Sequence, residues 1–180
     1  MKNYVLLGVI ALVMLLSVPA AMAADITVSG PVEQPAIGVS ILGTQTPAFT
    51  QLITGAACNP VTPADGMPSV QAVVTGAGVT SWAVTASSPT PGWGILPGDM
   101  YQSADHSKVL ADYFQLGSSA KPYRYMNTVW PDFMTSTDPL KTTTGTFADS
   151  LYMKQCISGL DQNGVYTIAV SFTGMVTGTA

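Results

Sequence analysis

Charged side chains are scarce in this chain. Asp, Glu, Lys and Arg together make up 9% of its 180 residues, against about 25% in ordinary soluble domains. Between residues 26 and 98 the only charges are Glu33 and Asp65. A dispersed monomer needs more surface charge than this, and the many Val, Ile, Leu and aromatic residues exclude a disordered composition. The shortage predicts that much of the folded surface contacts other protein.

Basic residues and histidine are also few. Six basic against ten acidic residues give a net charge of −4. An acidic chain without a basic patch is not expected to bind nucleic acid or anionic membrane surfaces. The only histidine, His106, excludes a metal site built on several histidines. Nucleotide-binding loops and zinc patterns are absent as well, so we expect no cofactor.

Catalytic patterns are weak. Asp105, His106 and Ser107 are the residue types of a nucleophilic triad, but consecutive residues do not converge in that geometry, and a polar loop or helix cap is the better interpretation. Asp99, Asp105 and Asp112 are too widely spaced for a compact calcium loop. A carboxylate pair from distant strands, as in glycoside hydrolases, stays open. The sequence favours a protein that is not an enzyme.

The first 23 residues are typical of a signal peptide. Lys2 provides the positive start, residues 4–18 form an apolar run, and Ala21-Met22-Ala23 is a small-residue cleavage site. A retained membrane anchor is the alternative, although the run is short for a span. Cleavage leaves one domain, residues 24–180, with a net charge of −5 once Lys2 is removed. We therefore expect an extracellular, cell-surface protein that does not contact the membrane after cleavage.

Two cysteines, Cys58 and Cys156, are present. Because an exported chain meets an oxidising environment, we expect them to form a disulfide. The bond would close a loop of about 100 residues, worth up to about 4–5 kcal/mol in the chain-entropy model. Two buried free thiols are the other interpretation.

The clearest structural pattern lies near the C-terminus. After a predicted turn at residues 161–164, apolar and small polar residues alternate strictly, as in a strand with one apolar face. The apolar positions are Tyr166, Ile168, Val170 and Phe172, and the others are Thr167, Ala169, Ser171 and Thr173. We expect this strand at the centre of a sheet, paired as a hairpin with a strand over 151–158, while residues 176–180 trail off.

Shorter alternating segments occur along the rest of the chain. They are residues 25–30, 36–42, 69–75 and 81–87. Residues 50–58 are ambiguous, residues 59–68 form a Pro-rich loop, and an irregular or short helical insertion is expected around 99–117. Turn signals every ~8–12 residues favour an all-β fold, an antiparallel β-sandwich of jelly-roll or Ig-like type.

Three of these segments carry a resemblance to known proteins. Residues 26–30, 82–86 and 164–174 resemble small exported β-sandwich proteins that form the surface or sheath of methanogenic archaea, and are faintly similar to bacterial WxL cell-surface domains. The resemblance implies a structural role at the cell surface and provides no catalytic residues.

One cluster of aromatic residues is a candidate binding site. It consists of Tyr123, Arg124, Tyr125, Trp130 and Phe133. These residue types are enriched at protein interfaces and also stack on sugar rings. They serve equally well as core residues. If they are exposed, the cluster predicts a secreted adhesion or glycan-binding module.

Association with copies of itself is the favoured function. No Asn-x-Ser/Thr sequon occurs, so an N-linked glycan coat does not keep the surface soluble. We expect an exported subunit that assembles through strand edges and uncharged faces into a sheath, fibre or layer. The strand freed by cleavage, with Ile26 and Val28, is a candidate donor strand for a neighbour. Other cell-envelope proteins or glycans are further candidate partners.

Overall fold

The computed structural model describes residues 34–49, 58–60 and 67–180. The predicted signal peptide, the donor residues Ile26 and Val28, and most of the ambiguous stretch at 50–58 lie outside the described residues. The described residues belong to one compact unit, Glu33–Ala180.

The described part of the chain is all-β and contains no helix. Its strands, in chain order, are β1 (Ala36–Leu42), β2 (Asn59–Pro60), β3 (Ser69–Thr75), β4 (Val79–Ser87), β5 (Tyr101–Gln102), β6 (Gln115–Ser118), β7 (Arg124–Tyr125), β8 (Trp130–Thr135), β9 (Gly145–Gln155), β10 (Tyr166–Thr167) and β11 (Ser171–Thr179).

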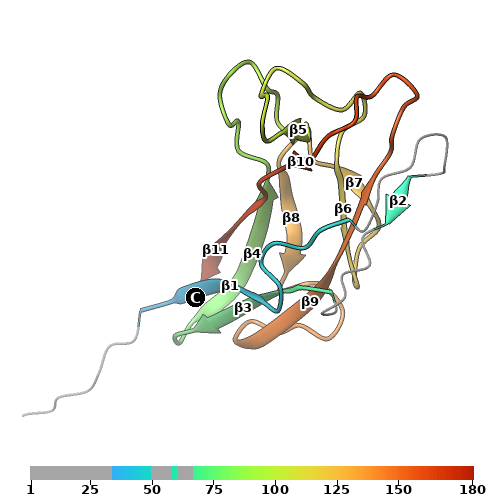
Figure 1. The fold of residues 1–180 in the computed structure, drawn as a ribbon. Coiled ribbons are helices and arrows are strands. Elements are labelled where there is room, and N and C mark those ends of the chain that lie inside the picture. The colour runs from blue at the N-terminus through green and yellow to red at the C-terminus, as the bar shows by residue number, and fades with distance from the viewer. Residues whose placement is uncertain (1–33, 50–57, 61–66) are drawn as a thin grey trace, which may run out of the picture. The chain divides into compact units, whose positions relative to one another are not determined.

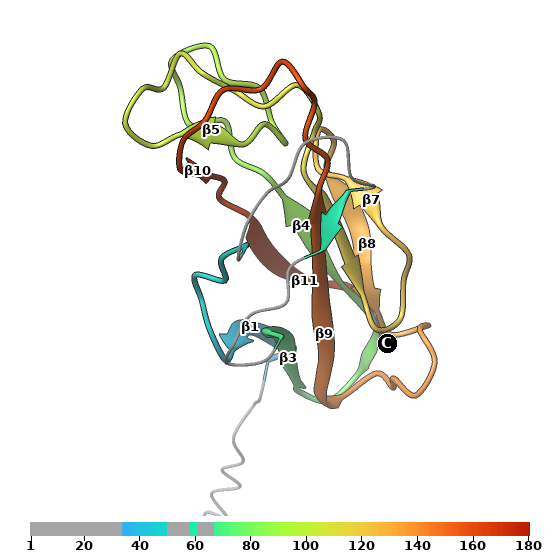
Figure 2. The ribbon, with the colours of Figure 1, turned by 45° about the vertical axis from the view of Figure 1, so that its right-hand side comes forward.

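The strands form two main sheets (Figures 1 and 2). The larger has the order β1-β3-β9-β6-β7, with β2 also paired to β9, and the smaller has the order β11-β4-β8. β5 and β10 form a separate short pair at one end. Every pairing between strands is antiparallel. The two main sheets contribute to one apolar core, which is the arrangement of a β-sandwich.

The period-two pattern correctly predicts the buried faces of β3 and β4. Their inward residues are Val70, Ala72 and Val74 from β3 and Trp82, Val84 and Ala86 from β4, all buried. Trp82 stacks on Phe147 of β9 with ring centroids 5.2 Å apart, which joins the two sheets. Because alternate side chains of a strand point to opposite faces, one buried face fixes the pattern.

The predicted position of the last strand is wrong. β11 lies at the edge of the smaller sheet and pairs with β4, while β9 lies between β3 and β6 in the larger sheet. The expected hairpin between residues 151–158 and the last strand does not form. The Asp161 carboxylate accepts hydrogen bonds from the amides of Ser158 (2.7 Å) and Ala111 (2.9 Å). This anchor directs the chain toward β5 before it enters the other sheet.

The extent of the last strand also differs from the prediction. The chain forms β10, leaves the ladder at residues 168–170, and continues as β11 to Thr179, so residues 176–180 do not trail off. The amide of Ala180 donates to the carbonyl of Gly78 at 2.7 Å. The predicted alternation is confirmed: Tyr166, Ile168, Val170 and Phe172 are half-buried, and the residues between them are exposed.

The insertion at 99–117 is irregular, not helical. Tyr101 pairs with Val109 as an isolated bridge, and the amide of Leu110 donates to the carbonyl of Met100 at 2.9 Å. The Asp105 carboxylate accepts hydrogen bonds from the Ser107 amide and hydroxyl. This local turn competes with a helix, because short polar side chains bond to nearby backbone groups.

Candidate functional site

An apolar cleft of about 800 Å³ lies in the described part of the chain. One wall is the end of β1 and the chain that follows it, from Ile41 to Phe49. The opposite wall is the chain from Gly164 to Phe172, which includes β10 and the start of β11. Between them lie core side chains, namely Met100, Phe114, Leu116, Leu151 and Met153. These five side chains are buried, so the cleft is backed by the apolar core.

The cleft forms because the two edge strands diverge. At Gly174 of β11 the sheets are close, and a Cβ there would lie 2.7 Å from Val39 Cγ2 and 2.9 Å from Ile37 Cγ1. Farther toward the start of β11, Phe172 and Val170 line the cleft. The inward side chains of both strands are half-buried along their whole length.

The strands that border the two walls, β1 and β11, are edge strands of their sheets, and neither carries a residue that would block pairing with another chain. β1 pairs only with β3 and β11 pairs only with β4 among the described residues. The sequences of β1 and β11, AIGVSIL and SFTGMVTGT, contain no charge and no proline. Charged residues and prolines are the usual devices that prevent an edge from pairing with another chain.

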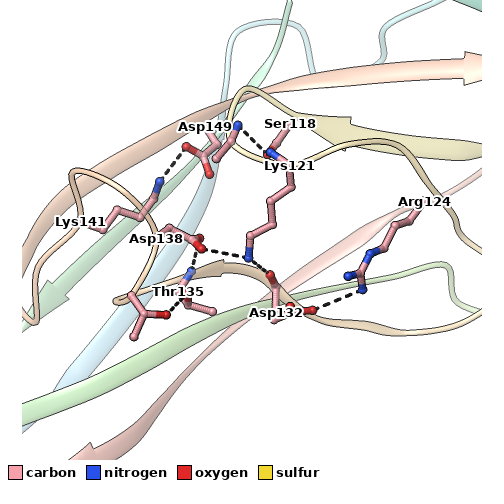
Figure 3. Close-up of polar contacts among 10 residues, drawn as sticks. Ser118, Lys121, Arg124, Asp132, Thr135, Asp138, Lys141 and Asp149 are labelled. Atoms are coloured by element: carbon pink, nitrogen blue, oxygen red, sulfur yellow. Dashed lines mark hydrogen bonds and ion pairs between the residues drawn. The ribbon is translucent and has the colours of Figure 1, made fainter.

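Four basic side chains outside β1 and β11 are paired with aspartates, and Figure 3 shows three of these pairs. Lys141 and Asp149 form an ion pair of 2.9 Å with both side chains nearly inaccessible. Lys121 pairs with Asp138 at 3.1 Å and also donates to the carbonyl of Asp132. Arg124 pairs with Asp132 at 3.5 Å, and the Thr135 amide donates a hydrogen bond to the Asp138 carboxylate at 2.8 Å. A fourth ion pair, Lys108–Asp105 at 3.3 Å, lies in the 99–117 insertion.

The predicted aromatic cluster divides between core and surface. Trp130 is 2% exposed and Phe133 is fully buried, and their rings meet edge to face at 5.2 Å. Tyr123, Arg124 and Tyr125 are exposed. The Arg124 guanidinium lies over the Trp130 ring at 4.9 Å. Only the three exposed residues are available to a ligand at the surface.

A second aromatic site was not predicted from the sequence. Trp93 is 68% exposed, and its ring stacks on His106 with centroids 4.1 Å apart. Tyr101 meets His106 edge to face at 5.5 Å. Trp93 has a positive φ of 54° between Gly92 and Gly94, an uncommon conformation for a residue with a side chain. A tryptophan inside a Pro- and Gly-rich loop is the signal that indicates such a site.

The Asp105-His106-Ser107 segment has no triad geometry. The Ser107 hydroxyl donates to the Asp105 carboxylate at 2.7 Å, and the His106 ring contacts Trp93 and Tyr101. Hydrogen bonds from the Ser107 hydroxyl and amide, and then the contact with Lys108, lower the pKa of Asp105 below its usual value.

The predicted disulfide between Cys58 and Cys156 is confirmed. It indicates an oxidising compartment. Within the described ranges, no group of three or more His, Cys, Asp or Glu side chains is placed to hold a metal ion. The same part of the chain has no helix that is long and apolar enough to cross a membrane.

Comparison with known proteins gives no relative. No family model, no curated protein and no solved structure matches this chain.

Proposed function

We propose that this protein is an exported structural subunit that assembles with copies of itself, through strand edges and uncharged sheet faces, into a sheath, fibre or layer at the cell surface. In this proposal the sandwich is of Ig-like or jelly-roll type and has no catalytic role. The sequence resemblance to archaeal surface and sheath proteins supports the proposed location.

The single observation that carries the proposal is that the two edge strands, β1 and β11, are uncharged and lack a strand partner on one side among the described residues. β1 and β11 each present an uncharged, unpaired edge among the described residues. An exposed edge offers a row of N–H and C=O groups that another strand satisfies. Proteins that remain monomeric block such edges with charge or proline, and the described sequences of β1 and β11 contain neither.

The distribution of charge supports the same conclusion. Four of the five basic residues that remain after cleavage are in ion pairs with aspartates. Three of these pairs involve residues on or next to β7, β8 and β9, and none involves a residue of β1 or β11. Among the described residues, Lys154 is the one basic side chain outside these pairs, and β1 and β11 carry no charge that would keep copies apart.

The proposal is tested by adding charge to the β11 edge. The mature chain with Ser171→Lys and Thr173→Lys, two exposed positions, should lose assembly, because two lysines on an edge oppose strand addition. The matched control, Thr143→Lys with Thr144→Lys in the exposed β8–β9 loop, adds the same charge and should assemble normally. Equal assembly of both variants, measured by electron microscopy and light scattering, would contradict the proposal.

A second candidate is an adhesion or glycan-binding module. The observation that favours it is the exposed Trp93 ring, which stacks on the His106 ring. Aromatic rings exposed in this way stack on sugars. Trp93→Ala and Tyr125→Ala should then abolish binding on a glycan array with the fold retained. No binding by the wild-type chain to any glycan would eliminate this candidate.

A further inference from the structure

We propose that the apolar cleft takes the N-terminal segment of a second copy, residues 25–30, as an added strand beside β11. This inference rests on the proposed self-assembly and names the contact that joins one subunit to the next. Ile26 and Val28 would fill the cleft, and Thr27 and Ser29 would face outward.

The cleft has the features of a strand acceptor. Along its second wall, inward side chains recur at every second residue, as Tyr166, Ile168, Val170 and Phe172. These side chains are half-buried, so the sandwich is apolar but incompletely covered there. An added strand presents its own side chains with the same spacing of about 6.6–6.8 Å per two residues. Its inward residues would bury the remaining apolar surface.

The backbone beside the cleft is also suitable. The stretch that borders the cleft, residues 164–172, leaves the ladder at 168–170 and enters β11 only at its end, where Phe172 lines the cleft. From there β11 uses one edge for β4 and has no strand partner on the other edge among the described residues. Main-chain hydrogen bonds along such an edge provide affinity, and pockets for alternate side chains provide specificity. The cleft and the edge together specify an extended segment with one apolar face.

The N-terminal segment meets this requirement. Its sequence, Asp25-Ile26-Thr27-Val28-Ser29-Gly30, alternates apolar and small polar residues and spans about 20 Å when extended. It lies outside the described residues and, after the predicted cleavage, at the free end of the chain. A free end can enter a cleft without threading a loop.

The position of β1 favours a second copy over the same chain. The chain enters β1 at Ala36, whereas the cleft begins at Ile41, about 16 Å farther along the strand. Pro35 lies against Gly76, where an added Cβ would be 2.7 Å from Pro35 Cα. Gly30 and Gln34 each precede a proline, which favours extended conformations and disfavours the reversal needed to reach the chain's own cleft.

The test compares two double variants of the mature chain with equal added charge. Ile26→Asp with Val28→Asp places charge on the face that enters the cleft, and burying unpaired charge is costly. Thr27→Asp with Ser29→Asp places it on the outward face. We expect assembly to be lost in the first variant and retained in the second, measured by sedimentation. Circular dichroism should show the same fold in both.

A peptide provides an independent readout. A fluorescent peptide with the sequence of residues 24–33 should bind the Ile26→Asp/Val28→Asp chain one to one. The same peptide with both aspartates should bind at least about tenfold more weakly. Absence of peptide binding would overturn the inference.

The two proposals fail in different ways. If the wild-type chain and both variants assemble equally, strand insertion is overturned and self-assembly stands. If the wild-type chain stays monomeric, the proposed function fails. Peptide binding to the Ile26→Asp/Val28→Asp chain would then show that each chain fills its own cleft, which also overturns insertion between copies.

Discussion

At the scale of single residues, burial separates stabilising positions from candidate binding positions. Lys141 and Asp149 are a charged pair almost excluded from water, and the second carboxylate oxygen of Asp149 has no hydrogen-bond partner among the described residues. Such a pair depends on both members, because either charge alone is costly in the interior. Neither charge of the pair is left at the surface.

Removing one member of this pair should destabilise the protein strongly. Lys141→Met leaves the buried Asp149 carboxylate without its partner and should cost about 3–5 kcal/mol. Lys141→Met with Asp149→Leu should recover most of that loss, because no buried charge remains. Urea unfolding of both variants measures the difference. Equal stability of the single and the double variant would show that the pair is not buried as described.

Gly174 provides a second residue-scale prediction. Gly174→Ala puts a Cβ against Val39 and Ile37, where β11 and β1 approach each other, and should cost about 1–3 kcal/mol by overpacking. Gly38→Ala is the control, because its Cβ would meet nothing within 4 Å and alanine is preferred to glycine in a strand interior. A similar loss of stability in both variants would contradict the close approach of the two strands at this point.

At the scale of elements, the disulfide connects the short β2 region to the end of β9. Cys58 precedes β2, and Cys156 follows β9, with a sequence separation of 98 residues. A cross-link over so long a loop restricts the unfolded chain considerably, by about 4–5 kcal/mol in the entropic model.

Reduction of this bond should lower the melting temperature markedly. Thermal unfolding with and without reductant, together with alkylation and mass measurement, tests the prediction. An unchanged melting temperature after verified reduction, or two free thiols in the native protein, would refute it.

The turn at residues 105–108 should respond to acid. Since the fold lowers the pKa of Asp105, its carboxylate stabilises the turn above the unfolded value of 3.8, and this contribution is lost as the pH falls through the lower folded value. The Ser107 amide signal in NMR should titrate with a midpoint below 3.8, and Asp105→Asn should abolish this titration. A midpoint at or above 3.8 would contradict the hydrogen bonds from Ser107.

The sequence predicts strands and their faces better than it predicts their partners. Alternation identifies β3, β4 and the inward face of β10 and β11, because burial of one face demands it. It does not reveal that β11 is an edge strand, since that depends on distant contacts such as Asp161 with Ala111. Trp130 shows the same limit: an aromatic residue suits a core and a binding surface equally. The cleft depends on where β1 and β11 diverge, for which the sequence has no signal.

At the scale of the whole molecule, assembly should be insensitive to salt. Ionic strength screens contacts between exposed charges, with a Debye length that falls from about 10 Å at 0.1 M to about 3 Å at 1 M. Uncharged edges such as those of β1 and β11 contain nothing to screen. The concentration at which assembly begins should not rise when sodium chloride increases from about 0.1 M to about 1 M. A steep rise, measured by light scattering, would indicate ion pairs between subunits.

The central claim is that the exterior of this molecule is built to meet copies of itself. The most direct measurement is sedimentation velocity combined with electron microscopy on the mature chain, residues 24–180, purified without denaturant. The account predicts particles far larger than one subunit, visible as filaments or sheets. A single species with the mass of one chain, at the highest concentration reached, would contradict it.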